Sequence, residues 1–177
     1  PPAALAATGN VPLAAGCLGV AARVEGLGSR LELDVVPPEV TDTYGDVQLA
    51  DYVARDEPDF VGLSLYLWNV ERSLHLAREV KARSPRPRGL IGGPEVSADN
   101  PFVLSQEGFD VAVTGEAEDT FAPLMARLLG RPPGYNCHRL RFLGGRHDDG
   151  PGLDNPRFLR GYLAKSVPKD SLMVKAQ

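Results

Sequence analysis

Residues 59–69, DFVGLSLYLWN, contain the run that decides the fold class of this chain. The first part, residues 60–66, is mostly apolar, which is typical of a central parallel strand buried on both faces. The end is unusual, because a tyrosine, the only tryptophan of the chain (Trp68) and Asn69 stand where the strand finishes. The carboxyl ends of parallel strands are where α/β proteins bind ligands. We therefore expect this stretch to supply both a core strand and one wall of a binding site.

Segments typical of strands and of helices alternate on both sides of this stretch. The apolar pattern predicts five strands, over residues 3–8, 31–36, 60–66, 88–93 and 109–116. It predicts five helices between and after them, over residues 11–25, 46–55, 70–82, 101–107 and 118–129. This alternation is typical of an α/β fold, a doubly wound five-stranded parallel sheet with helices on both faces. Because crossovers are right-handed, few topologies remain, and we predict the flavodoxin-like or Rossmann-like strand order 2-1-3-4-5.

The character of the chain changes after residue 130. Residues 131–177 are rich in glycine, proline and arginine and show little periodicity, so we predict a linker tail that packs only in places. Residues 1–130 are then the predicted domain, in which Asn10 and Asn69 stand at helix N-cap positions. The chain begins with two prolines and without an initiator methionine, so we expect a fragment or a processed chain.

The overall composition argues against several classes of partner. The chain has 177 residues, 43% of them hydrophobic, with a net charge of −4 and an isoelectric point near 5.4. This acidic balance argues against nucleic acid and acidic membrane surfaces as partners. No apolar run approaches the roughly 18 residues of a membrane span and no signal peptide is recognisable, so a cytoplasmic location is expected. Cys17, Cys137 and three scattered histidines form no metal-binding pattern, so we expect free thiols and no metal site.

Loops at the predicted carboxyl edge of the sheet are the candidate binding site. Gly92 and Gly93 allow a ligand to approach the backbone closely, although a simple turn would use the same residues. Ser64 either bonds to neighbouring backbone or leaves space between strands. Trp68 presents a large apolar surface and an N–H group that requires a partner, with a lid over the core as the alternative. Glu116 stands at a helix start, where the dipole favours a carboxylate in any case.

Motifs of several common enzymes are absent from the sequence. No G-x-G-x-x-G follows a strand, no Walker A lysine occurs, and no G-x-S-x-G presents a serine nucleophile. No nucleophile stands beside a base, so no catalytic residue is predicted. The pattern favours a binder of a large, flat ligand, with an apolar and aromatic floor and glycine-lined room for a tail.

Three segments, taken in order, resemble one known family. They are PDFVGLSLYLWNVERSLHLAREVKARSP, LIGGPEVS and FDVAVTGEAEDTFAPLMARLL, over residues 58–85, 90–97 and 109–129. They resemble the cobalamin (vitamin B12)-binding domain that precedes the catalytic barrel of class B radical SAM enzymes. TGNVPLAAGCL near the start and the tail NPRFLRGYLAKSVPKDSLMVKAQ match as well, so the resemblance covers essentially the whole chain. Its specificity comes from SLYLWN, GGPE and GE-x-E-x-x-F occurring together in this order.

The resemblance implies cobalamin bound base-off and His-off. Related domains typically carry D-x-H-x-x-G after the first strand, S-x-L at the third and Gly-Gly after the fourth. Ser64 takes the serine position here, Tyr66 replaces the leucine, and the two glycines follow at a similar interval. The first motif is missing, because TGNVPLAAG contains no histidine. His75 is no substitute, since it lies well inside a predicted helix.

The same resemblance implies a role for each loop. Trp68 would cover the lower face of cobalt without ligating it, and the glycines would line the slot for the nucleotide tail. Glu95, Gly115 and Glu116 would bond to corrin amides or to the tail. The full set of implied cofactor-binding residues is Thr8, Gly9, Asn10, Val11, Pro12, Ser64, Leu65, Tyr66, Leu67, Trp68, Asn69, Gly92, Gly93, Pro94, Glu95, Gly115 and Glu116.

The resemblance also implies the activity of a longer parent protein. S-adenosylmethionine and a 4Fe–4S cluster would be held by a downstream radical SAM domain, whose Cys-x3-Cys-x2-Cys motif is not in this chain. The expected parent is a C-methyltransferase that transfers methyl from methylcobalamin to an unactivated carbon of a small-molecule or peptide substrate, and this chain alone should be inactive. Two alternatives stay open: a domain of this fold that has lost cobalamin, and a flavodoxin-like binder of a nucleotide or flavin.

Overall fold

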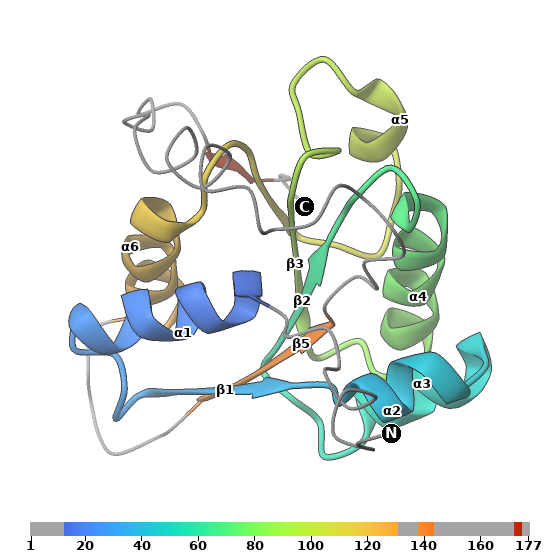
Figure 1. Ribbon diagram of the computed structural model, residues 1–177, viewed down its shortest axis with the longest axis horizontal. Coiled ribbons are helices and arrows are strands. Elements are labelled where there is room, and N and C mark those ends of the chain that lie inside the picture. The colour runs from blue at the N-terminus through green and yellow to red at the C-terminus, as the bar shows by residue number, and fades with distance from the viewer. Residues whose placement is uncertain (1–12, 131–137, 144–171, 175–177) are drawn as a thin grey trace, which may run out of the picture.

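One sheet organises the computed structural model, which describes residues 13–130, 138–143 and 172–174 (Figure 1). The strands are β1 (Leu31–Val35), β2 (Phe60–Ser64), β3 (Arg88–Gly92), β4 (Val111–Val113), β5 (His138–Leu143) and β6 (Leu172–Val174). Their order is β1-β5-β2-β3-β4-β6. The first five strands of that order are parallel, and β6 is antiparallel to β4. The predicted class, a parallel α/β sheet, is confirmed.

Helices cover both faces of this sheet. The described residues form α1 (Leu13–Val24), α2 (Pro38–Thr43), α3 (Asp46–Ala54), α4 (Val70–Arg83), α5 (Pro101–Leu104) and α6 (Glu118–Leu128). α1 and α6 pack on one face, and α3 and α4 on the other (Figure 1). Every residue of β2 is buried, which explains why its sequence is apolar without alternation. No helix within the described ranges is both long and apolar enough to cross a membrane.

Each face of the sheet has its own hydrophobic core. On one face, α3 and α4 enclose Leu49 and Leu74, which are each 1% exposed. On the other face, α1 and α6 enclose Ala15 and Met125, which are fully buried.

Arg83 of α4 donates to Glu79 at 2.7 Å and also to Asp51 of α3. The hydrogen bond from Arg83 lowers the pKa of the Glu79 carboxyl group.

Most predicted elements are present, with small differences in their bounds. The predicted strand 109–116 is shorter, because only Val111–Val113 pairs with the sheet. The short helix α2 was not predicted; it begins at Pro38, and proline favours the first turn of a helix. The predicted strand 3–8 and the predicted N-cap Asn10 lie outside the described residues.

The strand in the middle of the sheet is not the one that was predicted there. The predicted strand order placed residues 3–8 between the strands that are now β1 and β2. In the structure β5 lies there, with Leu33 of β1 and Phe60 of β2 both opposite Leu140. No strand was predicted after residue 116, because residues 131–177 are rich in glycine, proline and arginine and show little periodicity. The division into a domain over residues 1–130 and a linker over residues 131–177 stays a prediction.

Arg141 of β5 is a charged residue inside the sheet layer, and its partners explain how it can be buried there. It is 5% exposed, and its Nε donates to the Asp34 carboxylate at 3.0 Å. Its Nη1 donates to the backbone carbonyls of Tyr52 at 2.8 Å and Arg55 at 3.1 Å. These carbonyls stand at the C-terminal end of α3, where backbone carbonyl groups have no N–H partner within the helix. The guanidinium group also lies 5.4 Å from the centroid of the Tyr52 ring. Arg141 therefore ties β5 to both β1 and α3.

We expect Arg141→Met to lower the free energy of unfolding by about 2–3 kcal/mol, because the α3 carbonyls lose charged donors and Asp34 loses its partner. Urea denaturation measures this change. Arg141→Lys should recover only part of the loss, since a single ammonium group cannot replace the guanidinium fork. The matched control is Arg86→Met, which removes the exposed 3.2 Å pair with Glu57 and should cost almost nothing. An Arg141→Met chain as stable as the unmodified one would contradict this account of β5.

Candidate functional site

Loops from three strands meet at the carboxyl edge of the sheet. β2 ends at Ser64 and β3 ends at Gly92, and these two residues are partners in the parallel register. The Leu65 amide donates to the Gly92 carbonyl at 2.7 Å, and the Glu95 amide donates to the Leu65 carbonyl at 3.2 Å. A Cβ atom on Gly92 would lie 3.8 Å from the Val113 carbonyl oxygen at the end of β4. The structure thus brings the predicted loops after β2, β3 and β4 together.

The loop between β2 and α4 is held by the side chain of Asn69. Its Oδ1 accepts from the Tyr66 amide at 2.7 Å, and its Nδ2 donates to the Ser64 carbonyl at 3.0 Å. The backbone amides of Asn69 and Val70 both donate to the Tyr66 carbonyl, at 3.0 and 2.9 Å. The predicted N-cap position of Asn69 before α4 is confirmed, but its side chain makes no capping bond. The amide turns back toward the loop instead of toward the helix.

Two aromatic rings form the outer surface of this loop. The rings of Tyr66 and Trp68 are stacked, with centroids 4.7 Å apart and planes 10° apart. Trp68 is 50% exposed and Leu67 is 78% exposed. Leu65 is different, because its side chain is fully buried in the core on the α3–α4 face. The loop therefore offers a flat aromatic and aliphatic surface, and such exposed apolar groups are typical of interaction sites.

The glycines of the predicted site differ in what surrounds them. Gly93 has φ +108°, and a Cβ atom there would lie 2.6 Å from the Leu65 carbonyl oxygen and 3.0 Å from its nitrogen. Gly92 would make only one ordinary contact, at 3.8 Å. Gly115 has φ +75°, and no described atom lies within 4 Å of the position of its missing Cβ. Gly93 is thus required by contact within the chain, whereas Gly92 would tolerate a Cβ atom in ordinary contact and Gly115 faces open space.

The polar groups of the site are few. Ser64, the last residue of β2, is 7% exposed. The Glu95 carboxylate accepts from Asn100 Nδ2 at 3.3 Å. Pro94 is exposed and Glu116 is half-buried. These groups lie where a ligand across the three loops could reach them.

Asn100 is a loop-holding residue that the sequence analysis missed. Its Nδ2 donates to the Glu95 carbonyl at 3.0 Å, and its Oδ1 accepts from the Val103 amide at 3.3 Å. The available signal was an asparagine directly before Pro101, which is the usual arrangement of an N-cap followed by proline in the first turn. Asn100 orders the loop after β3 much as Asn69 orders the loop after β2.

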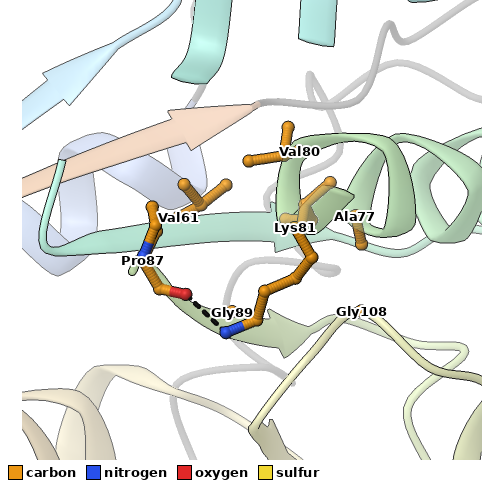
Figure 2. A pocket seen from close by; sticks show the side chains of 8 residues that line it. Val61, Ala77, Val80, Lys81, Pro87, Gly89 and Gly108 are labelled. Carbon is orange, nitrogen blue, oxygen red and sulfur yellow. Dashed lines mark hydrogen bonds between the residues drawn. The ribbon is translucent and has the colours of Figure 1, made fainter. Parts of the chain in front are cut away.

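Two cavities lie away from these loops. The first, shown in Figure 2, has a volume of about 10 Å³ and holds at most one water molecule. Lys81 reaches across this region to donate to the Pro87 carbonyl at 2.6 Å, near the amino end of β3. The second, of about 310 Å³, lies between α1 and the amino end of β1 and includes Gly19 and Leu31 in its walls. Neither cavity is the predicted site.

The predicted residues Thr8, Gly9, Asn10, Val11 and Pro12 lie outside the described residues. Within the described ranges, no group of three or more histidine, cysteine, aspartate and glutamate side chains could hold a metal ion. The described part of the candidate site is therefore a surface made of three loops, apolar at Leu67 and Trp68, open at Gly115, and polar at Ser64 and the two glutamates.

Comparisons with known proteins bear on what these loops hold. A family model described as B12 binding domain matches residues 4–125. The cobalamin-dependent radical SAM methyltransferase TokK of Streptomyces tokunonensis is 38% identical over 92 residues, which are 51% of this chain and 13% of that protein. The 2-(S-pantetheinyl)-carbapenam-3-carboxylate methyltransferase of Streptantibioticus cattleyicolor is 40% identical over 81 residues, which are 45% of this chain and 12% of that protein. The match thus covers only a small part of the length of both relatives.

Proposed function

This chain belongs to the B12-binding domain family, and we propose that it holds cobalamin across the three loops at the carboxyl edge of its sheet. The observation that carries this placement is the half-exposed Trp68, stacked on Tyr66 in the loop whose first residue, Leu65, donates to the Gly92 carbonyl. In doubly wound sheets, ligands bind at this edge. The matched family segment, residues 4–125, includes all three loops.

The residues present suit a corrin. A corrin ring is broad and flat, carries amides on its rim and has a long nucleotide tail. Leu67 and Trp68 offer a flat apolar surface for the ring. The Ser64 hydroxyl group and the backbone at Gly92, where a Cβ atom would make one ordinary contact at 3.8 Å, offer a polar path for the tail. Glu95 and Glu116 stand where they could accept hydrogen bonds from rim amides.

We propose further that the cofactor binds base-off and His-off, with Trp68 against its lower face. An indole ring has no lone pair available to ligate a metal, so Trp68 would fill that face and exclude water without coordinating cobalt. His75 lies inside α4 and not in the loop that carries Trp68. Bound methylcobalamin would supply the methyl group for transfer. The chain's own contribution is to bind and orient the ring, and none of its residues is proposed to be catalytic.

The parent protein is proposed to be a radical SAM C-methyltransferase that acts on an unactivated carbon. The support is that both relatives are named as methyltransferases and that one is named as cobalamin-dependent and radical SAM. S-adenosylmethionine and a 4Fe–4S cluster would then be held by a further domain of that parent protein. The substrate, a small molecule or a peptide, would be bound outside this chain.

Mixing the chain with hydroxocobalamin, desalting it and recording the absorption spectrum tests this proposal. We expect near-stoichiometric retention with a base-off spectrum. Trp68→Ala should weaken binding by about tenfold or more, because a large aromatic contact is worth more than the roughly 1.4 kcal/mol that tenfold represents. The matched control is Val24→Ala, which truncates a 77% exposed residue of α1 far from the carboxyl edge.

A colourless chain after desalting would contradict cobalamin retention by this domain alone. The same measurement on a longer protein that includes the radical SAM domain then decides between two readings. Retention there would show that the second domain closes the site. Absence of cobalamin there too would favour a domain that keeps the fold without the cofactor. Binding of a flavin or nucleotide instead would favour the flavodoxin-like alternative.

A further inference from the structure

We propose that Asn69 is a positioning residue, which sets the Trp68 ring in its place before any cofactor binds. The inference rests on the proposed function only for what the ring then touches. The arrangement itself belongs to the cofactor-free chain, and it is carried by the contacts between Ser64 and Asn69.

The side chain of Asn69 closes the loop from both ends. Its Nδ2 donates to the Ser64 carbonyl at 3.0 Å, at the last residue of β2. Its Oδ1 accepts from the Tyr66 amide at 2.7 Å. Backbone groups just beyond a strand no longer have ladder partners, so they need bonds of this kind. One amide side chain thus fixes the path of the backbone that leads to Trp68.

Tyr66 transmits this restraint to Trp68. Its amide is bonded by the Asn69 side chain, and its carbonyl accepts from the backbone amides of Asn69 and Val70. Its ring is stacked on the Trp68 ring, with centroids 4.7 Å apart. A half-exposed ring would otherwise sample several rotamers, and ordering it during binding costs affinity. With Tyr66 held by Asn69, that ordering is already in place.

The chemistry of the position selects asparagine. An asparagine directly before a helix normally caps the helix, yet the Asn69 side chain makes no capping bond. Aspartate and serine cap helices comparably well, so capping alone would not require an amide. The loop requires one acceptor and one donor on the same short side chain. Aspartate has the right size but only accepts, so Asn69→Asp keeps the bond from the Tyr66 amide and loses the bond to the Ser64 carbonyl.

The test uses Trp68 as its own reporter, because it is the only tryptophan of the chain. Acrylamide quenching and anisotropy of its fluorescence are measured in the cofactor-free chain for the unmodified protein, Asn69→Ala and Asn69→Asp. We expect quenching by acrylamide to rise toward the value of the urea-unfolded chain and anisotropy to fall in Asn69→Ala, with Asn69→Asp in between. Hydroxocobalamin binding should weaken by about two- to tenfold, the cost of ordering one large side chain.

The matched control is Asn100→Ala. Asn100 makes a comparable pair of bonds, to the Glu95 carbonyl at 3.0 Å and from the Val103 amide at 3.3 Å, in the loop after β3. Its loss should lower stability to a similar degree while leaving the quenching and anisotropy of Trp68 unchanged. If Asn69 had only a structural role, Asn69→Ala and Asn100→Ala would show the same quenching and anisotropy of Trp68. The contrast between them therefore separates positioning from general stability.

The outcomes are distinguishable from those of the proposed function. Unchanged Trp68 quenching in a folded Asn69→Ala chain would overturn the inference, as would unchanged hydroxocobalamin affinity in a variant whose quenching has risen. If Asn69→Ala does not fold, Asn69→Asp, which keeps the size of the side chain, decides by the same two readouts. Failure of the unmodified chain to bind cobalamin would contradict the proposed function, and the quenching measurement would still decide whether Asn69 holds Trp68.

Discussion

A chain that ends at residue 130 is expected to lose the cooperative unfolding transition of the full chain. It lacks β5, which pairs in parallel with β1 on one side and with β2 on the other. It also lacks Leu140, which is fully buried, and Arg141, which is 5% exposed. Losing an interior strand removes ladder bonds and packing worth roughly 5 kcal/mol or more, which is comparable to the whole stability of an ordinary domain. Circular dichroism during urea and thermal unfolding measures the effect.

A chain that ends at residue 143 is the matched control for this truncation. It keeps β5 and removes only the rest of the tail, including the edge strand β6, so it should still unfold cooperatively. The family match ends at residue 125, before β5 begins, which makes the comparison informative. A 1–130 chain as stable as the full chain would mean that another segment completes the sheet. That result would support the predicted order, with residues 3–8 between β1 and β2.

Replacement of Gly93 by alanine is expected to destabilise the fold by about 3 kcal/mol or more, because strain and steric overlap act together. The residue has φ +108°, which side-chain-bearing residues rarely adopt. The new Cβ would lie 2.6 Å from the Leu65 carbonyl oxygen, which is backbone and cannot swing aside. Relief would require the loops after β2 and β3 to separate, breaking the 3.2 Å bond from the Glu95 amide to Leu65. Urea denaturation measures the loss.

Gly92→Ala is the control for Gly93→Ala. The added methyl group would meet only the Val113 carbonyl oxygen, at an ordinary 3.8 Å. We therefore expect its stability to stay within about 1 kcal/mol of the unmodified chain. Equal stability of the two variants would show that the turn at Gly93 can rearrange, against the geometry described above.

Because alanine is expected to destabilise the fold at Gly93 and not at Gly92, the slot for the nucleotide tail is best tested at Gly92. Gly92 and Gly93 were predicted to line the slot together, but a bulky residue at Gly93 would disturb the fold and so could not report on cofactor binding. Gly92→Ala is the informative variant, because the chain should remain folded. A folded Gly92→Ala chain with weakened hydroxocobalamin binding would support the tail slot at this backbone, and unchanged binding would argue against it.

The sequence by itself determined the fold class and the edge of the sheet where the proposed site lies. A strand buried on both faces must be apolar at almost every position, so residues 60–64 identified a parallel sheet without any knowledge of their neighbours. The helices α3, α4 and α6 were predictable because the spacing of apolar residues is a local property. The loop that carries Trp68 followed from both, since it begins where the buried strand ends.

Only the tertiary structure decided which contacts those residues make. β5 lies in the sheet because Arg141 finds Asp34, a residue 107 positions earlier in the chain, together with the carbonyls at the end of α3. Asn69 turns away from its helix because the Ser64 carbonyl lies within its reach. Gly93 differs from Gly92 because a Cβ atom would overlap the Leu65 backbone at Gly93 and not at Gly92. Partners distant along the chain supply the bonds and the steric limits in each case, and local pattern carries no record of them.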